Sequence, residues 1–188
     1  MRENWLETTL GDILTLEYGK ALPASRRTGE GYPVFGSAGE VGRHSDFLVE
    51  GPGIIVGRKG TAGAVTWSDE PFFPIDTTYW VKINSTELDL RYARILLEHL
   101  DLSSISEQSG VPGLNREKAY RLPVSLPSVA AQRRIAALVG HLDSLKEALS
   151  RELGTLEGSR RALLSVLVSG DHAIPASYDD LIRDGEVA

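Results

Sequence analysis

Residues 129–168 read VAAQRRIAALVGHLDSLKEALSRELGTLEGSRRALLSVLV, and this stretch decides the fold. It contains no proline, and one apolar series recurs every seven residues, at Ile135, Leu142, Leu149, Leu156 and Leu163. The pattern predicts a coiled-coil-like helix of about 38 residues, roughly 57 Å long. A rod longer than a small domain is wide needs a partner helix for part of its apolar stripe. Since the chain shows no second long helix, we expect the partner to be another molecule.

A second apolar series fills the other core position of the heptad, at Leu138, Leu145 and Val166. It fails at Glu152 and Ser159, close to Gly154 and Gly158. We therefore expect residues 135–149 to be the best packed part of the helix, and the helix to bend or break near the two glycines.

Length and composition narrow the class of protein. The 188 residues are enough for one globular domain and an extension. The absence of cysteine excludes disulfides, thiolate zinc sites and cysteine nucleophiles. No apolar run approaches the roughly 18 residues of a membrane span, and the acidic start lacks the apolar core of a signal peptide. These features predict a cytoplasmic protein with no membrane segment.

The net charge of −6 at first sight disfavours nucleic acid as a partner. However, residues 171–188 hold five acidic residues and one basic residue. Without them the chain has 19 basic and 21 acidic residues, a balance of −2. A nearly neutral body can carry a basic face, so the total charge neither supports nor excludes DNA binding.

The chain before the long helix predicts a mostly antiparallel β region. Short runs rich in β-branched and aromatic residues predict strands at 32–35, 54–56, 64–67, 78–83 and 121–126. Thr86 with Asp89 offers a capping box for a helix at 87–100. Further caps are expected at Thr8 or Thr9, at Asn115, and at Ser128 and Gly170, the two ends of the long helix. The expected α+β fold has a domain at 1–127, a helical spacer and dimerisation region at 128–170, and a flexible acidic tail at 171–188.

The segment GRKGTAG at 57–63 has the clearest chemical character. Arg58 and Lys59 lie on a glycine-rich turn after a strand. Glycines let a backbone approach a phosphate, and the two cations neutralise its charge. The Gly-Lys-Ser/Thr ending of a Walker A loop is missing, and a strand follows where a dinucleotide fingerprint needs a helix. The alternative is a tight β-turn with exposed cations.

Other cations lie on the loops at 20–31 and 36–46. Arginine reads guanine through a bidentate contact, so arginines on loops that flank one sheet are candidates for reading DNA. The candidates for base edges are Arg26, Arg27, Arg43 and Arg58, with His44 beside Arg43, and those for phosphates are Lys20, Lys59 and Thr61. The alternative is a set of solvated surface loops.

Two remaining observations concern the loop before Arg116 and the enzyme signatures. SGVPGLN at 109–115 either contacts a phosphate through backbone N–H groups or serves as a rigid connector. The four histidines lack metal-ligand spacing, and the sequence shows no nucleophile elbow, methyltransferase tetrapeptide or nuclease cluster. We expect no catalytic residue, no metal and no cofactor bound by the chain itself.

Taken in order, these motifs resemble a known family. A tryptophan followed by LGDI, then IIVGRKGTAGAV, RLPVSLPSVAAQRRIAALVGHLDSLKEAL and LLSVLVSG, are similar to the specificity subunits of type I restriction–modification systems. The resemblance covers about residues 5–170. The family has Leu-Pro-Pro-Leu-x-Glu-Gln at the junction with the helix; this chain lacks the second proline and the glutamate, whereas Gln132 and Ile135 match. Full members have two recognition domains and two helical spacers, so this chain resembles a half-length form.

The resemblance implies a non-catalytic subunit whose target recognition domain directs an adenine methyltransferase to a bipartite DNA site. The implied partners are double-stranded DNA, a methyltransferase subunit that binds S-adenosylmethionine, a restriction (translocase) subunit, and a second copy paired antiparallel through the long helix. We expect the methyltransferase to contact basic positions of the helix, at Arg133, Arg134, Lys146, Arg151, Arg160 and Arg161.

A second hypothesis from another class stays open. The β region can be a protein- or glycan-binding module on a coiled-coil oligomerisation stalk, with no role in DNA binding. The net charge of −6 slightly favours it. A steep loss of DNA binding with rising salt separates the two hypotheses, because only phosphate contacts produce that slope.

Overall fold

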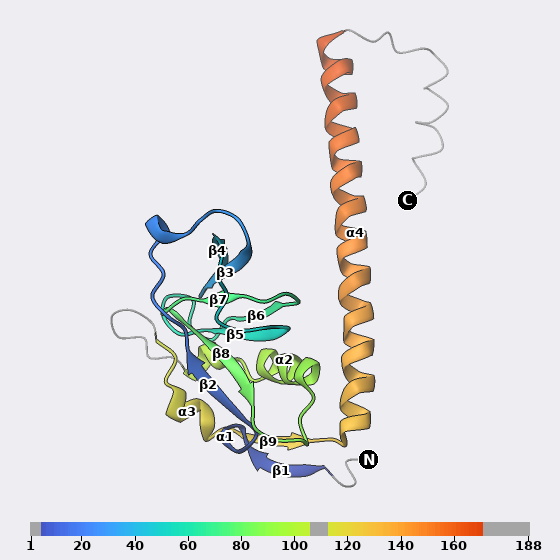
Figure 1. Ribbon diagram of the computed structural model, residues 1–188. Helices are drawn as coiled ribbons and strands as arrows, with labels where there is room; N and C mark the ends of the chain where they lie inside the picture. Colours follow the sequence, from blue (N-terminus) through green and yellow to red (C-terminus); the bar gives the residue numbers. More distant parts are fainter. Residues whose placement is uncertain (1–4, 106–112, 171–188) are drawn as a thin grey trace. The chain divides into compact units, whose positions relative to one another are not determined.

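The computed structural model describes residues 5–105 and 113–170. The chain divides into two compact units, residues 1–138 and residues 139–188. Within the described residues the first unit contains three β-sheets with short helices, and one long helix continues into the second unit (Figure 1). All strand pairs are antiparallel except that of β3 with β7. The predicted α+β class, with a mostly antiparallel β region and a long C-terminal helix, is confirmed.

The first unit is closed by a pairing between its two ends. β1 (Leu6–Thr9), which the sequence did not predict, runs antiparallel to β9 (Pro123–Leu126). α1 (Leu10–Ile13) follows β1 directly, with Thr9 at its N-cap as expected. Thr9 donates to Asp12 Oδ2 from Oγ1 at 2.6 Å and from its backbone N at 3.2 Å. These hydrogen bonds hold the pKa of Asp12 below its usual range, because they favour the charged carboxylate.

The four-stranded sheet forms the centre of the first unit, in the order β2-β8-β5-β6. Its strands are β2 (Leu14–Tyr18), β5 (Gly53–Gly57), β6 (Val65–Ser68) and β8 (Thr78–Ile83). Every residue of β5 is buried, as expected for an apolar run in the interior of a sheet. The buried face of α2 (Leu90–His99) joins β2 and β5 in one core, where Leu97 and Ile54 are fully buried.

The three-stranded sheet corrects one prediction. Its order is β4-β3-β7, with β3 at Tyr32–Gly36, β4 at Gly39–His44 and β7 at Phe73–Pro74. Residues 36–46 were expected to be a loop, and β4 shows that this was wrong. β4 is an edge strand whose residues are exposed or half-buried, so its sequence carries no apolar alternation. β7 is too short to leave any pattern.

The helix caps are partly as predicted. Asn115 accepts from Lys118 N at 3.1 Å and caps α3 (Arg116–Tyr120), which confirms the expected cap. The predicted capping box of Thr86 with Asp89 is wrong. Asp89 itself is the N-cap of α2, and its carboxylate accepts from the backbone N of Arg91 and of Tyr92. Short 3-10 turns lie at Ala24–Arg26 and Leu102–Ile105.

α4 (Val129–Ser169) is a single uninterrupted helix, and the predicted break near Gly154 and Gly158 is wrong. Ser128 Oγ accepts from Ala131 N at 3.4 Å at its start. Gly170 adopts φ +77° at its end, the left-handed conformation expected of a C-terminal glycine. No helix of the described residues is both long and apolar enough to cross a membrane.

Candidate functional site

The glycine-rich segment 57–63 is held between two other parts of the first unit. The backbone N of Arg58 and of Lys59 donates to Thr77 O at 2.9 and 3.1 Å. On the other side, Leu114 N donates to Arg58 O at 2.9 Å, and Lys59 forms an isolated bridge with Gly113. Residues 109–112 of the expected phosphate-contacting loop lie outside the described residues. The segment is therefore an ordered turn with fixed backbone partners.

The glycines of this turn serve mainly the packing of the protein itself. A Cβ at Gly57 would lie 2.1 Å from Thr61 O, and one at Gly63 would lie 2.4 Å from Ser103 N. In contrast, a Cβ at Gly60 would meet nothing within 4 Å, although φ is +79° there. Only Gly60 thus leaves backbone open to an outside molecule, and the other two glycines are required by close contact.

Gly63→Ala and Gly60→Ala form a matched pair of variants. We expect Gly63→Ala to lower the free energy of unfolding by about 3 kcal/mol, because it adds a backbone clash to the cost of a positive φ. Gly60→Ala carries only the conformational cost, about 1 kcal/mol. Urea unfolding followed by circular dichroism measures both. Equal losses in the two variants would show that the turn is not packed as described.

The side chain of Arg58 lies against an exposed aromatic ring. Its Cζ lies 4.9 Å from the ring centroid of Tyr18, and its Nη1 donates to Asp76 O at 2.9 Å. Arg116, from the start of α3, lies over the same ring at 5.1 Å and donates from Nη1 to Leu16 O at 3.3 Å. Tyr18 is 49% exposed, so the two guanidiniums meet at the surface. This Arg–Tyr–Arg cluster combines positive charge with an aromatic ring.

Two further tyrosines, the buried Tyr79 and the partly buried Tyr120, support the cluster. The Tyr79 ring lies 5.1 Å from the Tyr18 ring. Burial, together with the neighbouring Tyr18, raises the pKa of Tyr79 to about 12, although the charges of Arg58 and Arg116 oppose the rise. Tyr79 therefore keeps its proton at neutral pH. The hydroxyl of Tyr120 accepts from Leu16 N at 2.9 Å, which fixes α3 against β2.

Three further predicted residues lie on the turns around the cluster. Lys20 N donates to Pro74 O at 3.0 Å, which places Lys20 beside the 74–78 turn that also holds Arg58 and Lys59. The side chains of Lys20, Lys59 and Thr61 are exposed. The structure thus gathers half of the predicted DNA-contacting set, from two segments of the chain, around the 74–78 turn.

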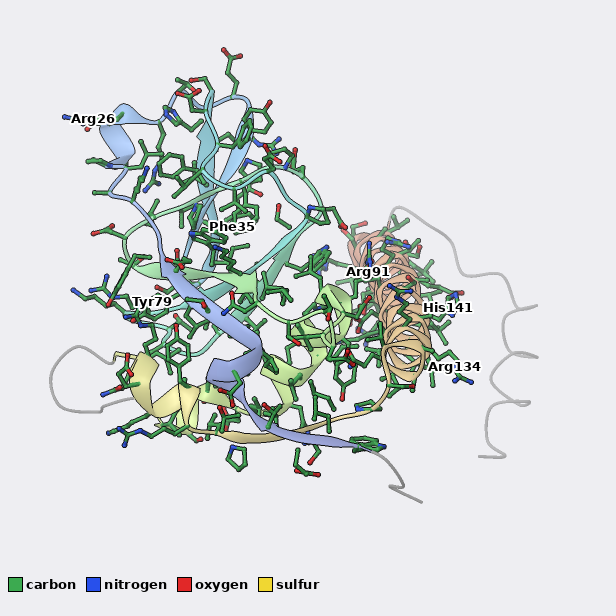
Figure 2. All side chains as sticks on the ribbon, turned by 60° about the horizontal axis from the view of Figure 1, so that its bottom comes forward. Arg26, Phe35, Tyr79, Arg91, Arg134 and His141 are labelled. Carbon is green, nitrogen blue, oxygen red and sulfur yellow. The ribbon has the colours of Figure 1, made fainter. Side chains whose placement is uncertain are left out.

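The other four predicted residues form a separate group on the loop at 24–27 and the β3–β4 hairpin. Arg27 Nη1 donates to Val41 O at 2.7 Å, and its Nε and Nη2 donate to Leu22 O, so this side chain holds the loop onto β4. Arg26 is exposed, and no side-chain hydrogen bond or ion pair is found for it among the described residues. Figure 2 shows Arg26 at the outer end of its loop, apart from Tyr79.

Arg43 and His44 lie on β4 and are both partly buried. Arg43 Nη2 lies 2.7 Å from Glu70 Oε1, and its Nε lies 3.8 Å from Glu40 Oε1, so two carboxylates share this guanidinium. The His44 ring packs edge-on against Phe73 at 5.9 Å. Arg27 and Arg43 are therefore bound within the protein, and Arg26 is the arginine of this group that stays available to DNA.

Tyr18 and Arg116 are the surface residues that the sequence analysis missed as contact candidates. A tyrosine at a strand end before a glycine, and an arginine after a capping asparagine, are visible in the sequence. Nothing in the sequence places either of them against Arg58. In residues 5–105 and 113–170, no group of three or more acidic or histidine side chains is arranged to hold a metal ion.

Comparison with known proteins adds the family. The profile of the type I restriction modification DNA specificity domain matches residues 2–155. The chain belongs to this family. The match includes all the loops with the predicted cations and the first 27 of the 41 residues of α4.

Relatives of this specificity domain include a bacterial protein and solved structures. The specificity subunit of the type I restriction enzyme EcoprrI of Escherichia coli is 26% identical over 148 residues, which are 76% of this chain and 37% of that protein. The fold is similar to that of the type I restriction-modification system S subunit from M. genitalium, with a TM-score of 0.71 and 23% identity over 90% of this chain and 47% of that one. The HsdS subunit from Thermoanaerobacter tengcongensis gives a TM-score of 0.62 at 18% identity, over 92% and 46%. The chain spans less than half the length of these relatives.

In this specificity domain, Gln132 fixes the first turn of α4. Its side chain is fully buried, and Nε2 donates to Glu87 O at 2.7 Å and to Pro127 O at 2.8 Å. Its Oε1 accepts from Asp89 N at 2.9 Å. One amide thus joins the start of α4 to the cap of α2.

The residues of α4 that were predicted to face a partner helix differ in burial: the first of them packs against the protein's own core, and the later ones are exposed. Ile135 packs against the core of the first unit. The other leucines of the stripe are exposed, with fractions of 55–62% for Leu138, Leu142, Leu145, Leu149 and Leu156, and 57% for Leu163. Leu153, which the heptad pattern did not include, is 58% exposed. Large apolar side chains at such spacing on a helix are typical of a contact surface.

Proposed function

We propose that the chain is the sequence-reading, non-catalytic component of a type I restriction–modification complex. The family match over residues 2–155 carries this proposal, because it spans the β domain and the start of the helix together. The Arg–Tyr–Arg cluster supports it with an exposed cationic surface on a protein whose total charge is negative. In the part of the chain that the structure describes, no observation favours the alternative of a protein- or glycan-binding module over DNA recognition.

The proposed recognition domain comprises residues 1–127. Its side chains would make two kinds of contact with DNA, to base edges and to phosphates. Arg26 is the best candidate for reading a base edge, because its guanidinium is exposed and without a partner among the described residues. Arg27 and Arg43 act mainly within the protein, because carbonyls and carboxylates already bind their guanidiniums. Lys20, Lys59 and Thr61 would contact phosphates.

The proposed partners follow from the family. The chain would direct a methyltransferase subunit to adenine in its target, with S-adenosylmethionine bound by that subunit, and a restriction subunit would join the same complex in the cytoplasm. Basic positions on α4, including Arg133 and Arg134, are exposed and accessible to such a partner. The chain itself would supply recognition and spacing and no catalytic group.

The proposed spacer is the helical region 128–170, paired antiparallel with a second copy. Its exposed leucines supply the apolar contact, and a pair of helices would hold two recognition domains at a fixed distance. Two domains related by a twofold axis read a two-part site, with half-sites about one helical turn of DNA apart. The acidic residues 171–188 lie outside the described residues and have no part in this proposal.

Single-molecule methylome mapping, with and without the gene, tests the proposed function. We expect one methylated adenine motif to disappear when the gene is deleted, and the motif to consist of two parts related by inverted symmetry. An unchanged methylome in a strain whose methyltransferase gene is active would contradict the role in recognition. An asymmetric motif would contradict the pairing of two identical copies.

A further inference from the structure

Arg58 and Arg116 come from distant parts of the chain and meet on one ring. Both Cζ atoms lie within 5.1 Å of the Tyr18 ring centroid, so the two guanidiniums are at most about 10 Å apart. Arg116 also lies 5.8 Å from the ring of Tyr120. Stacking on aromatic rings restricts the plane of each guanidinium, so both are held before any ligand arrives.

Each guanidinium keeps donors for an outside acceptor. An arginine side chain carries five N–H donors, and each of these two gives one nitrogen to a backbone carbonyl, Arg58 to Asp76 O and Arg116 to Leu16 O. A carbonyl carries no net charge, so the positive charge of both side chains is not neutralised by these bonds. Most N–H donors of each guanidinium therefore stay available to a phosphate oxygen.

Acidic side chains compete only weakly for the two arginines. Arg116 Nε lies 3.8 Å from Glu117 Oε1, but Glu117 is 70% exposed, and a long ion pair in that setting contributes little. Among the described residues, no carboxylate lies within ion-pair distance of Arg58. The cluster therefore differs from Arg43, which two glutamates share.

We propose that Arg58 and Arg116, held by Tyr18, form a clamp for the phosphodiester backbone of DNA that contributes affinity without reading sequence. This rests on the proposed function and changes the role of Arg58, for which the sequence favoured a base edge. Two fixed guanidiniums on an exposed ring suit the phosphates of one strand, whose charges recur about every 3.4 Å along the axis of the duplex. The ring is poorly placed to stack a base, because the guanidiniums already lie over it.

Binding of the full chain to a random-sequence duplex, measured against salt concentration with and without its methyltransferase partner, tests the clamp. Arg58→Gln and Arg116→Gln should each weaken binding roughly tenfold, and each should reduce the slope of log affinity against log salt by about one. In both variants, the preference for the sequence motif identified by methylome mapping over random DNA should stay unchanged. Arg58→Lys and Arg116→Lys should keep the slope and lose about threefold in affinity, since the charge stays and the fork is lost.

Arg91 provides a matched control. Its guanidinium also lies over an aromatic ring, that of Trp67 at 5.1 Å, but it is paired with Asp69 at 3.7 Å. Figure 2 shows Arg91 on a different side of the first unit from Tyr79. Arg91→Gln should leave both the affinity and the slope as in the wild type. Thermal unfolding of every variant shows whether the fold is kept, and the lysine variants test the clamp even if a glutamine variant unfolds.

The possible outcomes distinguish the clamp from the proposed function. If the wild type binds DNA with a steep salt slope and the glutamine variants do the same, the clamp is wrong and the recognition role stands. If a variant loses only its preference for the motif, the arginine reads a base, and the clamp is again wrong. If the wild type binds no DNA, alone or with its partner, the proposed function and the clamp both fail.

Discussion

Leu153→Lys is expected to convert the proposed dimer into a monomer of 20.4 kDa. Leu153 is 58% exposed and stands eleven residues, about three helical turns, after Leu142. It therefore lies on the same face as Leu142 and Leu149. Two lysines, one from each copy, would replace buried leucines in the seam, so the dissociation constant should rise roughly a thousandfold. Sedimentation equilibrium over a range of chain concentrations measures it.

Glu152→Lys is the matched control for Leu153→Lys, and it decides between two registers. A strict heptad places position 152 in the seam, and the glutamate there would weaken the helix pair. In the second register, two successive steps of four residues, from Leu145 to Leu149 and from Leu149 to Leu153, interrupt the heptad repeat. Leu153 then lies in the seam, and the apolar stripe runs without a gap from Leu138 to Leu156. We expect Glu152→Lys to leave the mass of the dimer unchanged. Dissociation by Glu152→Lys alone would show that the strict heptad is correct.

The long helix α4, the cap of α3 and the strand β5 were predictable because the residues that determine them lie within or next to these elements in the sequence. Asn115, Ser128 and Gly170 act within one turn of the helix ends that they mark, so the sequence next to them is sufficient. The interior strand β5 was predictable because burial on both faces demands an unbroken apolar run.

The strands at the edges were missed because burial imposes little on them. β1 has exposed and half-buried residues, and β4 includes two glycines and three charged or polar residues among six. Their position depends on hydrogen bonds to β9 and β3, which a sequence does not show. The same limit applies to the site. Arg58 could be singled out from its turn, but Tyr18 and Arg116 reach it only through the pairing of distant segments.

Gln132→Met is expected to lower the free energy of unfolding of the first unit by about 3 kcal/mol, although the two side chains have similar volumes. The substitution leaves Asp89 N, Glu87 O and Pro127 O without their partner, and each unsatisfied buried backbone group costs about 1–3 kcal/mol. Asp89 is only partly buried, so water can reach its backbone N–H, and the total cost of the three groups stays near the lower end of this range. The melting temperature should fall by roughly 10 °C.

Arg134→Met is the control for Gln132→Met. Arg134 lies two positions further on α4, is exposed, and makes one side-chain hydrogen bond, to Ala130 O at 3.3 Å. Its replacement should change the free energy of unfolding by no more than about 0.5 kcal/mol. Because Gln132 joins α4 to the cap of α2, its loss should also raise hydrogen exchange at Asp89 N, which Arg134→Met leaves unchanged. Protection of Asp89 N that survives in Gln132→Met would show that another group satisfies this amide, and that the glutamine does not fix the start of the helix.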